Sequence, residues 1–271
     1  MQFAICNEIF QGWTFPDTLA YARRAGYDAV EVAPFTVADR VTSVSPSQRA
    51  GLRAEAGKAG IEISGIHWVL AHTEGFHLSH PDSEVRERTA GYLVDLVDFC
   101  ADLGGRSMIV GSPRQRSLLP GVTRAEAWDR ATEVFRPAVA QASRRGVTVC
   151  IEPLAPAETD FINTFAEAAR FAAQFGSASM SVILDVKAMS SEAQSVPDVI
   201  RSAVGQFSYF HANDPNLKGP GFGDLDYRPV VAALREVGYD GVVSVEVFRF
   251  DEGPEAIATR SRDYLRRVFG G

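Results

Sequence analysis

A single (β/α)8 barrel is the fold class that the sequence predicts, and three observations predict it. Short apolar, β-branched runs alternate with longer amphipathic stretches throughout the chain, as in strand–helix units that build a parallel sheet. The length of 271 residues suits one barrel of ~250 residues, and no linker or low-complexity run divides it. A weak internal echo, AGYDAVEVAPF at 25–35 and VGYDGVVSVEVF at 237–248, fits a repeating unit, although a common turn recurring by chance is the alternative. We therefore expect one domain spanning residues 1–271.

The elements follow in order along the chain. Pro16 is expected to open the first helix, and Ser83 is expected to cap a helix that ends near residues 104–105. Thr123 begins a capping box that is completed by Glu126. The expected strands are the eight apolar runs at residues 3–7, 29–33, 62–68, 107–112, 148–153, 180–185, 207–213 and 242–248.

The composition limits the classes of function. The formal net charge is −7 and the pI is about 5.3, which argues against nucleic-acid binding and favours a small-molecule substrate. Cys6, Cys100 and Cys150 are odd in number and lie in apolar segments, so we expect buried free thiols in a reducing compartment. The N-terminus has no basic region before an apolar run, and no stretch approaches the ~20 apolar residues of a membrane span. The expected location is the cytoplasm, away from membranes.

Four polar residues each close an expected strand: Glu152, Asp185, His211 and Glu246. A polar group at the end of a buried strand is costly unless it is paired or binds a metal. In a barrel these strand ends meet at one mouth, where polar residues usually serve catalysis. Three carboxylates and one imidazole favour Mn²⁺, Mg²⁺ or Co²⁺ over a structural zinc. For each residue taken alone, pairing with an Arg or Lys at the rim is the alternative.

Glu152 and Glu246 would lie on strands five and eight, across the mouth from each other. A substrate between them would have a carboxylate on each face. A metal ion would polarise its carbonyl and stabilise an enediolate, while each glutamate serves as general base and then as general acid.

These motifs resemble the xylose-isomerase-like TIM-barrel superfamily, and within it the sugar (phosphate) isomerase/epimerase group that includes the ketose 3-epimerases. The resemblance runs through GYDAVEV, IEP, ILD, FHAND and GYDGVVSVEVF. It implies that Glu152, Asp185, His211 and Glu246 bind one divalent ion, with Mn²⁺ favoured and Mg²⁺, Co²⁺ or Zn²⁺ as alternatives. It also implies that Glu152 and Glu246 form the acid–base pair, that Glu158 contacts a carbohydrate substrate, and that the chain forms a homodimer or homotetramer.

The chain departs from the epimerase pattern where that pattern binds substrate. Those enzymes carry His three residues after the aspartate of strand six, where this chain has Ala188. They carry Arg six residues after the histidine of strand seven, where this chain has Leu217. An arginine in the segment after Glu152 is replaced by Ala155-Pro156. The metal chemistry is therefore expected to transfer, and the specificity for free ketoses is not.

Further residues near the strand ends are candidates for substrate binding. Lys187 and Lys218 could each bind an anion or pair with a nearby acid, and His67 could contact substrate or be a core histidine. Trp13 and Phe248 could stack on a sugar ring or pack in the core. Other candidates are Glu31 for substrate or a rim neighbour, Arg114 and Arg116 for an anion, Phe10, Phe35, Trp68 and Phe222 for stacking, and the loop histidines His72, His77 and His80 for a second metal.

The favoured function is a metal-dependent isomerase or epimerase of a sugar or sugar phosphate. The alternative is a metal-dependent dehydratase of a cyclic keto-polyol or keto acid, in which Lys187 would bind a carboxylate. A DNA-repair endonuclease is less favoured, because Ala188 and Asp226 stand where its histidine ligands would be expected. A non-catalytic sugar-binding barrel is disfavoured by the intact set of four ligands.

Overall fold

Eight parallel strands form a closed barrel in chain order, with β1 paired to both β2 and β8. The structure is a computed structural model that describes residues 1–270. All eight expected strands are present within one or two residues at most ends, so the predicted (β/α)8 fold is confirmed. The strands are β1 (Gln2–Cys6), β2 (Ala29–Val32), β3 (Glu62–Ile66), β4 (Ser107–Val110), β5 (Thr148–Ile151), β6 (Met180–Asp185), β7 (Phe207–Ala212) and β8 (Val242–Val245).

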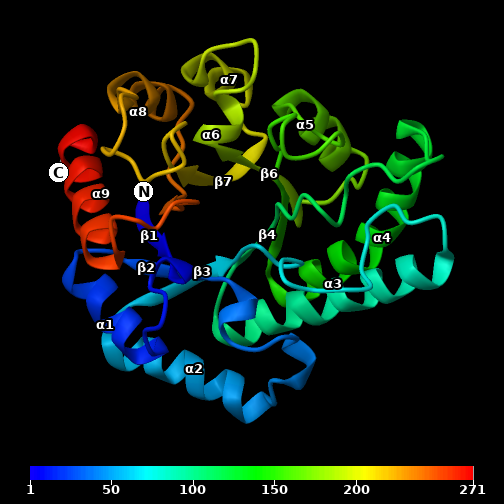
Figure 1. The fold of residues 1–271 in the computed structure, drawn as a ribbon, viewed down its shortest axis with the longest axis horizontal. Helices are drawn as coiled ribbons and strands as arrows, with labels where there is room; N and C mark the ends of the chain where they lie inside the picture. The colour runs from blue at the N-terminus through cyan, green and yellow to red at the C-terminus, as the bar shows by residue number, and fades with distance from the viewer. Residues whose placement is uncertain (271) are drawn as a thin grey trace.

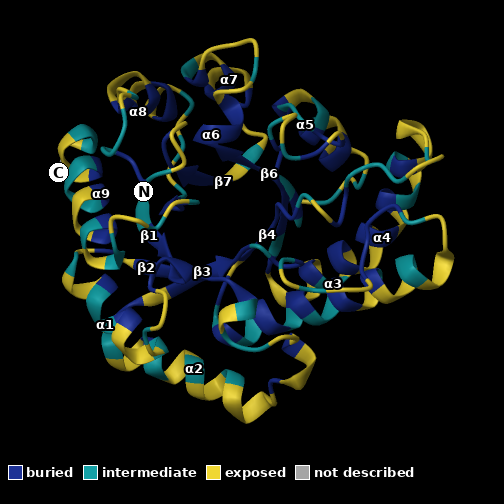
Figure 2. Cartoon of the chain, in the orientation of Figure 1, coloured by how far each residue is buried: buried dark blue, intermediate teal, exposed yellow. Residues whose placement is uncertain are grey.

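Helices surround the barrel, and their buried faces turn towards it while exposed residues line the outside (Figures 1 and 2). Short 3-10 turns η1 (Asn7–Ile9), η2 (Pro34–Thr36) and η3 (Val41–Ser43) lie in the loops after β1 and β2. The α-helices are α1 (Phe15–Arg24), α2 (Pro46–Ala59), α3 (Ser83–Leu103), α4 (Arg124–Arg145), α5 (Phe165–Ala173), α6 (Val186–Met189), α7 (Val196–Ser202), α8 (Tyr227–Glu236) and α9 (Pro254–Phe269).

Local capping explains where the helices begin. Thr123 and Glu126 form the predicted capping box of α4, each side chain bonding the other's backbone N–H. At α3 the prediction is wrong by one residue, because Asp82 and not Ser83 is the N-cap and accepts from the backbone of Glu84. An ionised carboxylate is a good acceptor for the free N–H groups of a first turn.

The core has two parts. A small cluster of Ile109, Cys150, Ile183 and Tyr209 lies inside the barrel, and a larger one lies between the sheet and the helices. All three cysteines are buried and free, as predicted. Among residues 1–270, no helix is both long and apolar enough to cross a membrane. Because the strands are parallel, their carboxyl ends share one rim, and the candidate site lies there.

Candidate metal centre and substrate pocket

The four predicted strand-end residues come together at the carboxyl ends of β5 to β8. Asp185 ends β6 and pairs in register with His211 of β7, while Glu152 and Glu246 directly follow β5 and β8. Each residue offers a ligand atom within 4.8 Å of those of the other three, and all four side chains are buried. The sequence therefore predicted which residues converge.

The donor atoms of this cluster fit a divalent cation. The Nδ1 atom of His211 lies 3.1 Å from Oε2 of Glu246 and 4.0 Å from Oε1 of Glu152. Both of the atoms that face each other, His211 Nδ1 and Glu246 Oε2, are buried, and apart from this ion pair neither has a hydrogen-bond partner. Buried polar atoms with so few partners are costly and rare. Oxygen ligands with one imidazole nitrogen are a donor set suited to Mn²⁺ or Mg²⁺, so the residues fit such an ion.

The two glutamates of the cluster have pKa values that are shifted in opposite directions. Burial, together with the charges of Glu246 and Asp185, raises the pKa of Glu152 to about 8. Burial alone would also raise the pKa of Glu246, but His211 outweighs it and holds that pKa well below the usual range. Glu152 thus holds a proton at neutral pH and Glu246 does not, because crowded carboxylates cannot all ionise without a cation.

Asp185 is fixed by two hydrogen bonds. The backbone N–H of Ala188 donates to its Oδ1 at 2.7 Å, and the side-chain amide of Asn213 donates to its Oδ2. The Oδ1 atom of Asn213 in turn accepts from the backbone N–H of Lys187 at 2.8 Å. We did not predict a role for Asn213, but its position two residues after His211 was a usable signal, since alternate strand residues point the same way.

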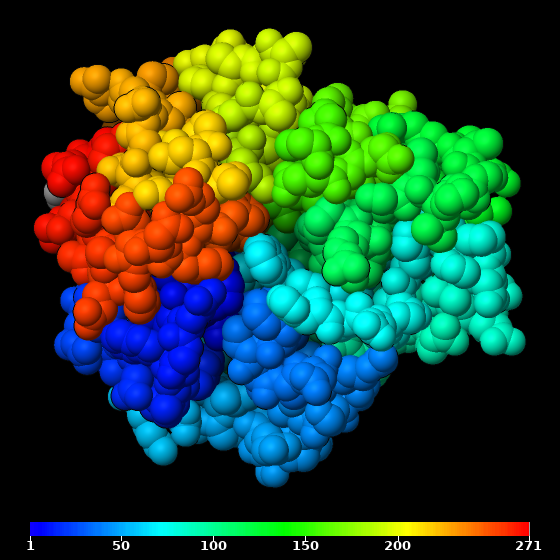
Figure 3. Space-filling view, viewed as in Figure 1, coloured from blue at the N-terminus to red at the C-terminus, as the bar shows by residue number. Residues whose placement is uncertain are grey.

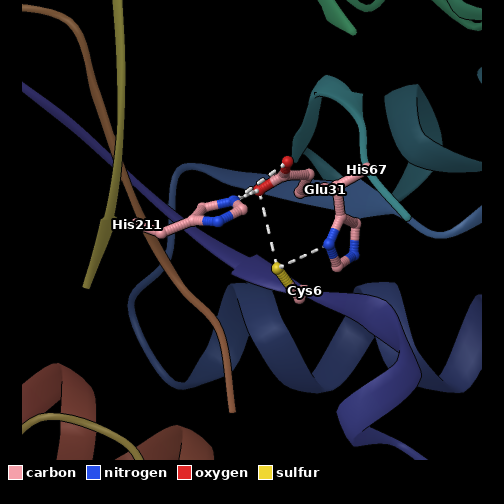
Figure 4. A group of neighbouring side chains, drawn as sticks. All are labelled: Cys6, Glu31, His67 and His211. Carbon is pink, nitrogen blue, oxygen red and sulfur yellow. Dashed lines mark hydrogen bonds and ion pairs between the residues drawn. The ribbon is translucent and has the colours of Figure 1, made fainter. Parts of the chain in front are cut away.

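A second group of polar side chains lies beside the first and shares His211 (Figure 4). The Nε2 atom of His211 is 3.1 Å from Oε2 of Glu31, and the thiol of Cys6 lies 3.5 Å from that same oxygen and 3.8 Å from Nδ1 of His67. Burial, with the nearby carboxylate of Glu31, raises the pKa of Cys6 well above its usual value, so the thiol stays neutral. Glu31 thereby pairs with a neighbouring rim residue, the second of its two predicted roles.

His67 is fully buried between two glutamates. Its Nε2 atom is 2.9 Å from Oε2 of Glu8, and its Nδ1 atom is 3.3 Å from Oε1 of Glu246. Burial opposes protonation, but the carboxylates of Glu8 and Glu31 outweigh it and raise the pKa of His67 to about 10. The structure therefore places His67 against a metal-ligand candidate and outside the lining of the pocket.

A pocket of ≈ 760 Å³ opens above the cluster. Of the four ligand candidates, Glu152 and Glu246 line it. In Figure 3 the orange surface that follows β8 and the cyan surface that follows β3 meet near the middle of the molecule, where these two loops form part of the pocket wall. The other lining residues are Trp68, Ala71, His72, Thr73, Glu74, Gly75, Phe76, Gly111, Ser112, Pro113, Arg114, Gln115, Leu154, Glu158, Lys187 and Phe248.

The predicted substrate contacts Glu158, Lys187 and Phe248 lie together in this wall. Lys187 donates to Oε1 of Glu158 at 2.7 Å, and its ammonium group lies 3.8 Å from the centre of the Phe248 ring. Phe248 also stacks on Trp68, whose indole N–H donates to Oε1 of Glu246 at 2.8 Å. The wall therefore connects an aromatic surface to one of the two glutamates.

Other predicted contacts lie elsewhere. Lys218 pairs with Glu252 and Asp251 and does not line the pocket, whereas Trp13 lines a smaller cavity next to it. Leu217 is 40% exposed, has a φ of 72°, and accepts at its carbonyl from the backbone N–H groups of Phe248 and Arg249.

The remaining candidates divide between pocket and protein interior. His72 and Arg114 line the pocket, whereas His77 bonds the carbonyl of Ser117 and belongs to neither group of metal donors found among residues 1–270. Arg116 is buried and donates to the backbone carbonyl of Glu152 at 2.6 Å.

A closed parallel barrel with buried acidic groups at the carboxyl ends of its strands defines a TIM-barrel enzyme. Residues 19–268 match the family described as xylose isomerase-like TIM barrel, and the chain belongs to that family. The resemblance seen in the sequence motifs is thereby confirmed.

Several relatives have sequences similar to much of this chain. D-psicose 3-epimerase of Ruminiclostridium cellulolyticum is 28% identical over 83% of this chain and 75% of its own length. 3-Dehydro-D-guloside 4-epimerase of Escherichia coli is 22% identical over 98% of this chain and 99% of its own. The crystal structure of D-psicose 3-epimerase with D-tagatose from Clostridium cellulolyticum H10 superposes with a TM-score of 0.87 at 24% identity, covering 99% of both chains, and so shares the fold.

Proposed function

We propose that this protein is a divalent-metal-dependent sugar epimerase or isomerase, formed by one domain of residues 1–271. The observation that carries the proposal is the convergence of Glu152, Asp185, His211 and Glu246 on one point, where the last two form a buried ion pair whose atoms make no other hydrogen bond. These four residues would bind one ion, and Mn²⁺ is favoured. When bound, the ion would polarise the carbonyl of the substrate and stabilise negative charge on its oxygen.

The division of roles among the four ligands follows from the pocket. Glu152 and Glu246 line it from β5 and β8, so a sugar in the pocket has access to a carboxylate from each. One glutamate removes a proton from the carbon next to the carbonyl, and the other returns a proton on the opposite face. Trp68 and His67 both contact Oε1 of Glu246 and so orient that carboxylate.

The charges in the pocket wall favour a neutral sugar over a keto acid as the substrate. Lys187, which favoured a dehydratase of an acidic substrate, pairs with Glu158, and its charge is thereby balanced. The relatives described above act, by their names, on a free ketose and on a 3-dehydro-hexoside. We propose that this chain takes a carbonyl-bearing sugar of one of these two classes. A cytoplasmic location and a homodimer or homotetramer remain part of the proposal.

Metal binding can be tested by the metal content of purified protein. We expect close to one divalent ion per chain in the wild type and in Asp240→Ala, an exposed control, and none in Asp185→Ala. A tightly bound ion in Asp185→Ala would remove that residue from the ligand set.

The acid–base roles can be tested by exchange of the carbon-bound proton with deuterated water. Glu152→Gln and Glu246→Gln should each abolish exchange in a sugar that the wild type turns over, whereas Glu133→Gln on the exposed side of α4 should not. Exchange that persists in either pocket variant would assign the proton transfer to another residue.

A further inference from the structure

A second cavity of ≈ 420 Å³ adjoins the substrate pocket, and the mechanism proposed above makes no use of it. The two spaces share Trp68 and His72 as lining residues. The larger pocket alone lies within the ~300–1,000 Å³ that small-molecule sites usually occupy. The second cavity therefore adds room for a group attached to the molecule that reacts.

A buried carboxylate without a full set of partners lines this cavity. Glu8 is 6% exposed, and its Oε2 atom is bonded to His67, but its Oε1 atom has no hydrogen-bond partner. An unpaired buried acceptor is destabilising, so a ligand with a hydroxyl group there would recover a hydrogen bond. An ionised carboxylate can accept hydrogen bonds but cannot donate them, so the matching ligand must be a hydrogen-bond donor.

The walls of the cavity are aromatic, and none of the described lining residues is a Lys or Arg that could pair with an acidic ligand. Phe10 and Trp13 lie with ring centres 5.5 Å apart, and Phe35 and Trp68 lie 6.0 Å apart across the boundary with the pocket. None of the described lining residues is Lys or Arg, which argues against a phosphate or a carboxylate. Apolar faces with a few polar groups suit a sugar ring, whose C–H faces can pack on aromatic rings while its edge carries hydroxyls.

The backbone is strained where the two spaces meet. Trp68 has a φ of 51° and His72 a φ of 58°, and neither is glycine. Left-handed backbone at such residues costs free energy and clusters where it serves binding or catalysis. Here it holds the two side chains between the pocket and the cavity.

We propose that this cavity is a second sugar subsite, so that the substrate is a two-ring keto-sugar whose second ring lies between Trp13, Phe35 and Glu8 while the first lies between the catalytic glutamates. This inference rests on the proposed function and specifies its substrate class as glycoside-linked and not a free monosaccharide.

Comparison of one-ring and two-ring ketones tests the subsite. D-Fructose is compared with maltulose and isomaltulose, which carry a glucosyl ring on the same ketose, and a 3-keto-glucoside is compared with the corresponding 3-keto-disaccharide. Proton exchange into deuterated water gives kcat/KM for each. We expect at least one two-ring ketone to exceed its one-ring partner by tenfold or more. Gln11→Trp, which would fill the exposed mouth of the cavity, should lower that ratio at least tenfold, and Gln194→Trp in an exposed loop should not.

The outcomes separate the subsite from the proposed function. If one-ring ketones are turned over at least as well as every two-ring partner, or if Gln11→Trp leaves the ratio unchanged, the subsite is refuted and the epimerase proposal stands. If no ketone exchanges at all, the epimerase proposal fails, and tryptophan fluorescence then decides on the subsite alone. Cellobiose or maltose must bind at least tenfold more tightly than glucose to the wild type, and this advantage must disappear in Gln11→Trp; equal binding refutes the subsite.

Discussion

Glu31 should control metal affinity without touching the metal. Both of its carboxylate oxygens lie within 3.3 Å of Nε2 of His211, and neither side chain is exposed. With Nε2 donating to Glu31, the opposite ring nitrogen, Nδ1, is the one that faces the cluster, 3.1 Å from Oε2 of Glu246. Glu31→Gln keeps the shape and one acceptor oxygen but removes the charge.

The size of the effect follows from that difference. A hydrogen bond to a charged group contributes about 1.5–3 kcal/mol and a neutral one about 0.5–1.5 kcal/mol, so the loss is roughly 1–1.5 kcal/mol. Since 1.4 kcal/mol is a factor of ten, we expect about tenfold weaker metal binding. Glu31→Ala removes the acceptor as well and should approach the upper end of the usual ~10–100-fold range.

The assay is competition for Mn²⁺ against a fluorescent chelator at a fixed pH of ~8, near the raised pKa of Glu152. Glu62→Gln, an exposed glutamate on β3, is the matched control and should keep wild-type affinity. The melting temperature of each metal-free variant checks that the barrel is intact. Affinities of both Glu31 variants within twofold of the wild type would refute the assigned role.

Three further outcomes are expected. Binding of a divalent ion at pH ~7 should release one to two protons, because the raised pKa values of Glu152 and His211 keep both protonated until the ion displaces them; calorimetry in two buffers measures this. Gly111→Ala should lower metal affinity at least tenfold by chelator competition, because a Cβ atom there would lie 1.7 Å from Oε2 of Glu152. Tyr27→Phe should lower the free energy of unfolding in urea by about 0.5–1.5 kcal/mol, because its buried hydroxyl donates to the carbonyl of Ala258 at 2.9 Å.

Each outcome has a control or a contrary result. Absence of proton release would mean that Glu152 and His211 are already deprotonated before the metal binds. The control is Gly57→Ala, at an exposed helical glycine where an added Cβ atom would meet nothing within 4 Å. This variant should leave metal affinity unchanged. Tyr21→Phe removes a hydroxyl that is only half-buried and should cost less than Tyr27→Phe; equal costs would contradict the argument from burial.

The residues that the sequence could place are those fixed by strand periodicity. Glu152, Asp185, His211 and Glu246 each end an apolar run, and parallel strands bring such ends to one rim whatever the loops do. The alternation of side chains along a strand carries this information locally.

The residues that the sequence could not place depend on contacts between loops. One of the two glutamate partners of His67 is Glu8, which lies 59 positions earlier in the chain, and no local pattern links the two. Lys187 is the second residue after β6, whereas Lys218 lies further into the loop after β7 and pairs with Glu252. The second cavity likewise arises from the loops after β1, β2, β3 and β8, whose conformations follow from tertiary packing.

The loop after β7 has a consequence for how this scaffold can change its substrate. Leu217 accepts two hydrogen bonds from the loop after β8 at its backbone carbonyl, and 40% of the residue is exposed. These two hydrogen bonds use the backbone and so do not depend on which side chain occupies position 217. Evolution can exchange this leucine for an arginine, or the reverse, without rebuilding the loops, since both residues meet the same backbone cost at this φ. A single substitution at this position therefore changes a side chain on the rim and keeps both backbone hydrogen bonds to the loop after β8.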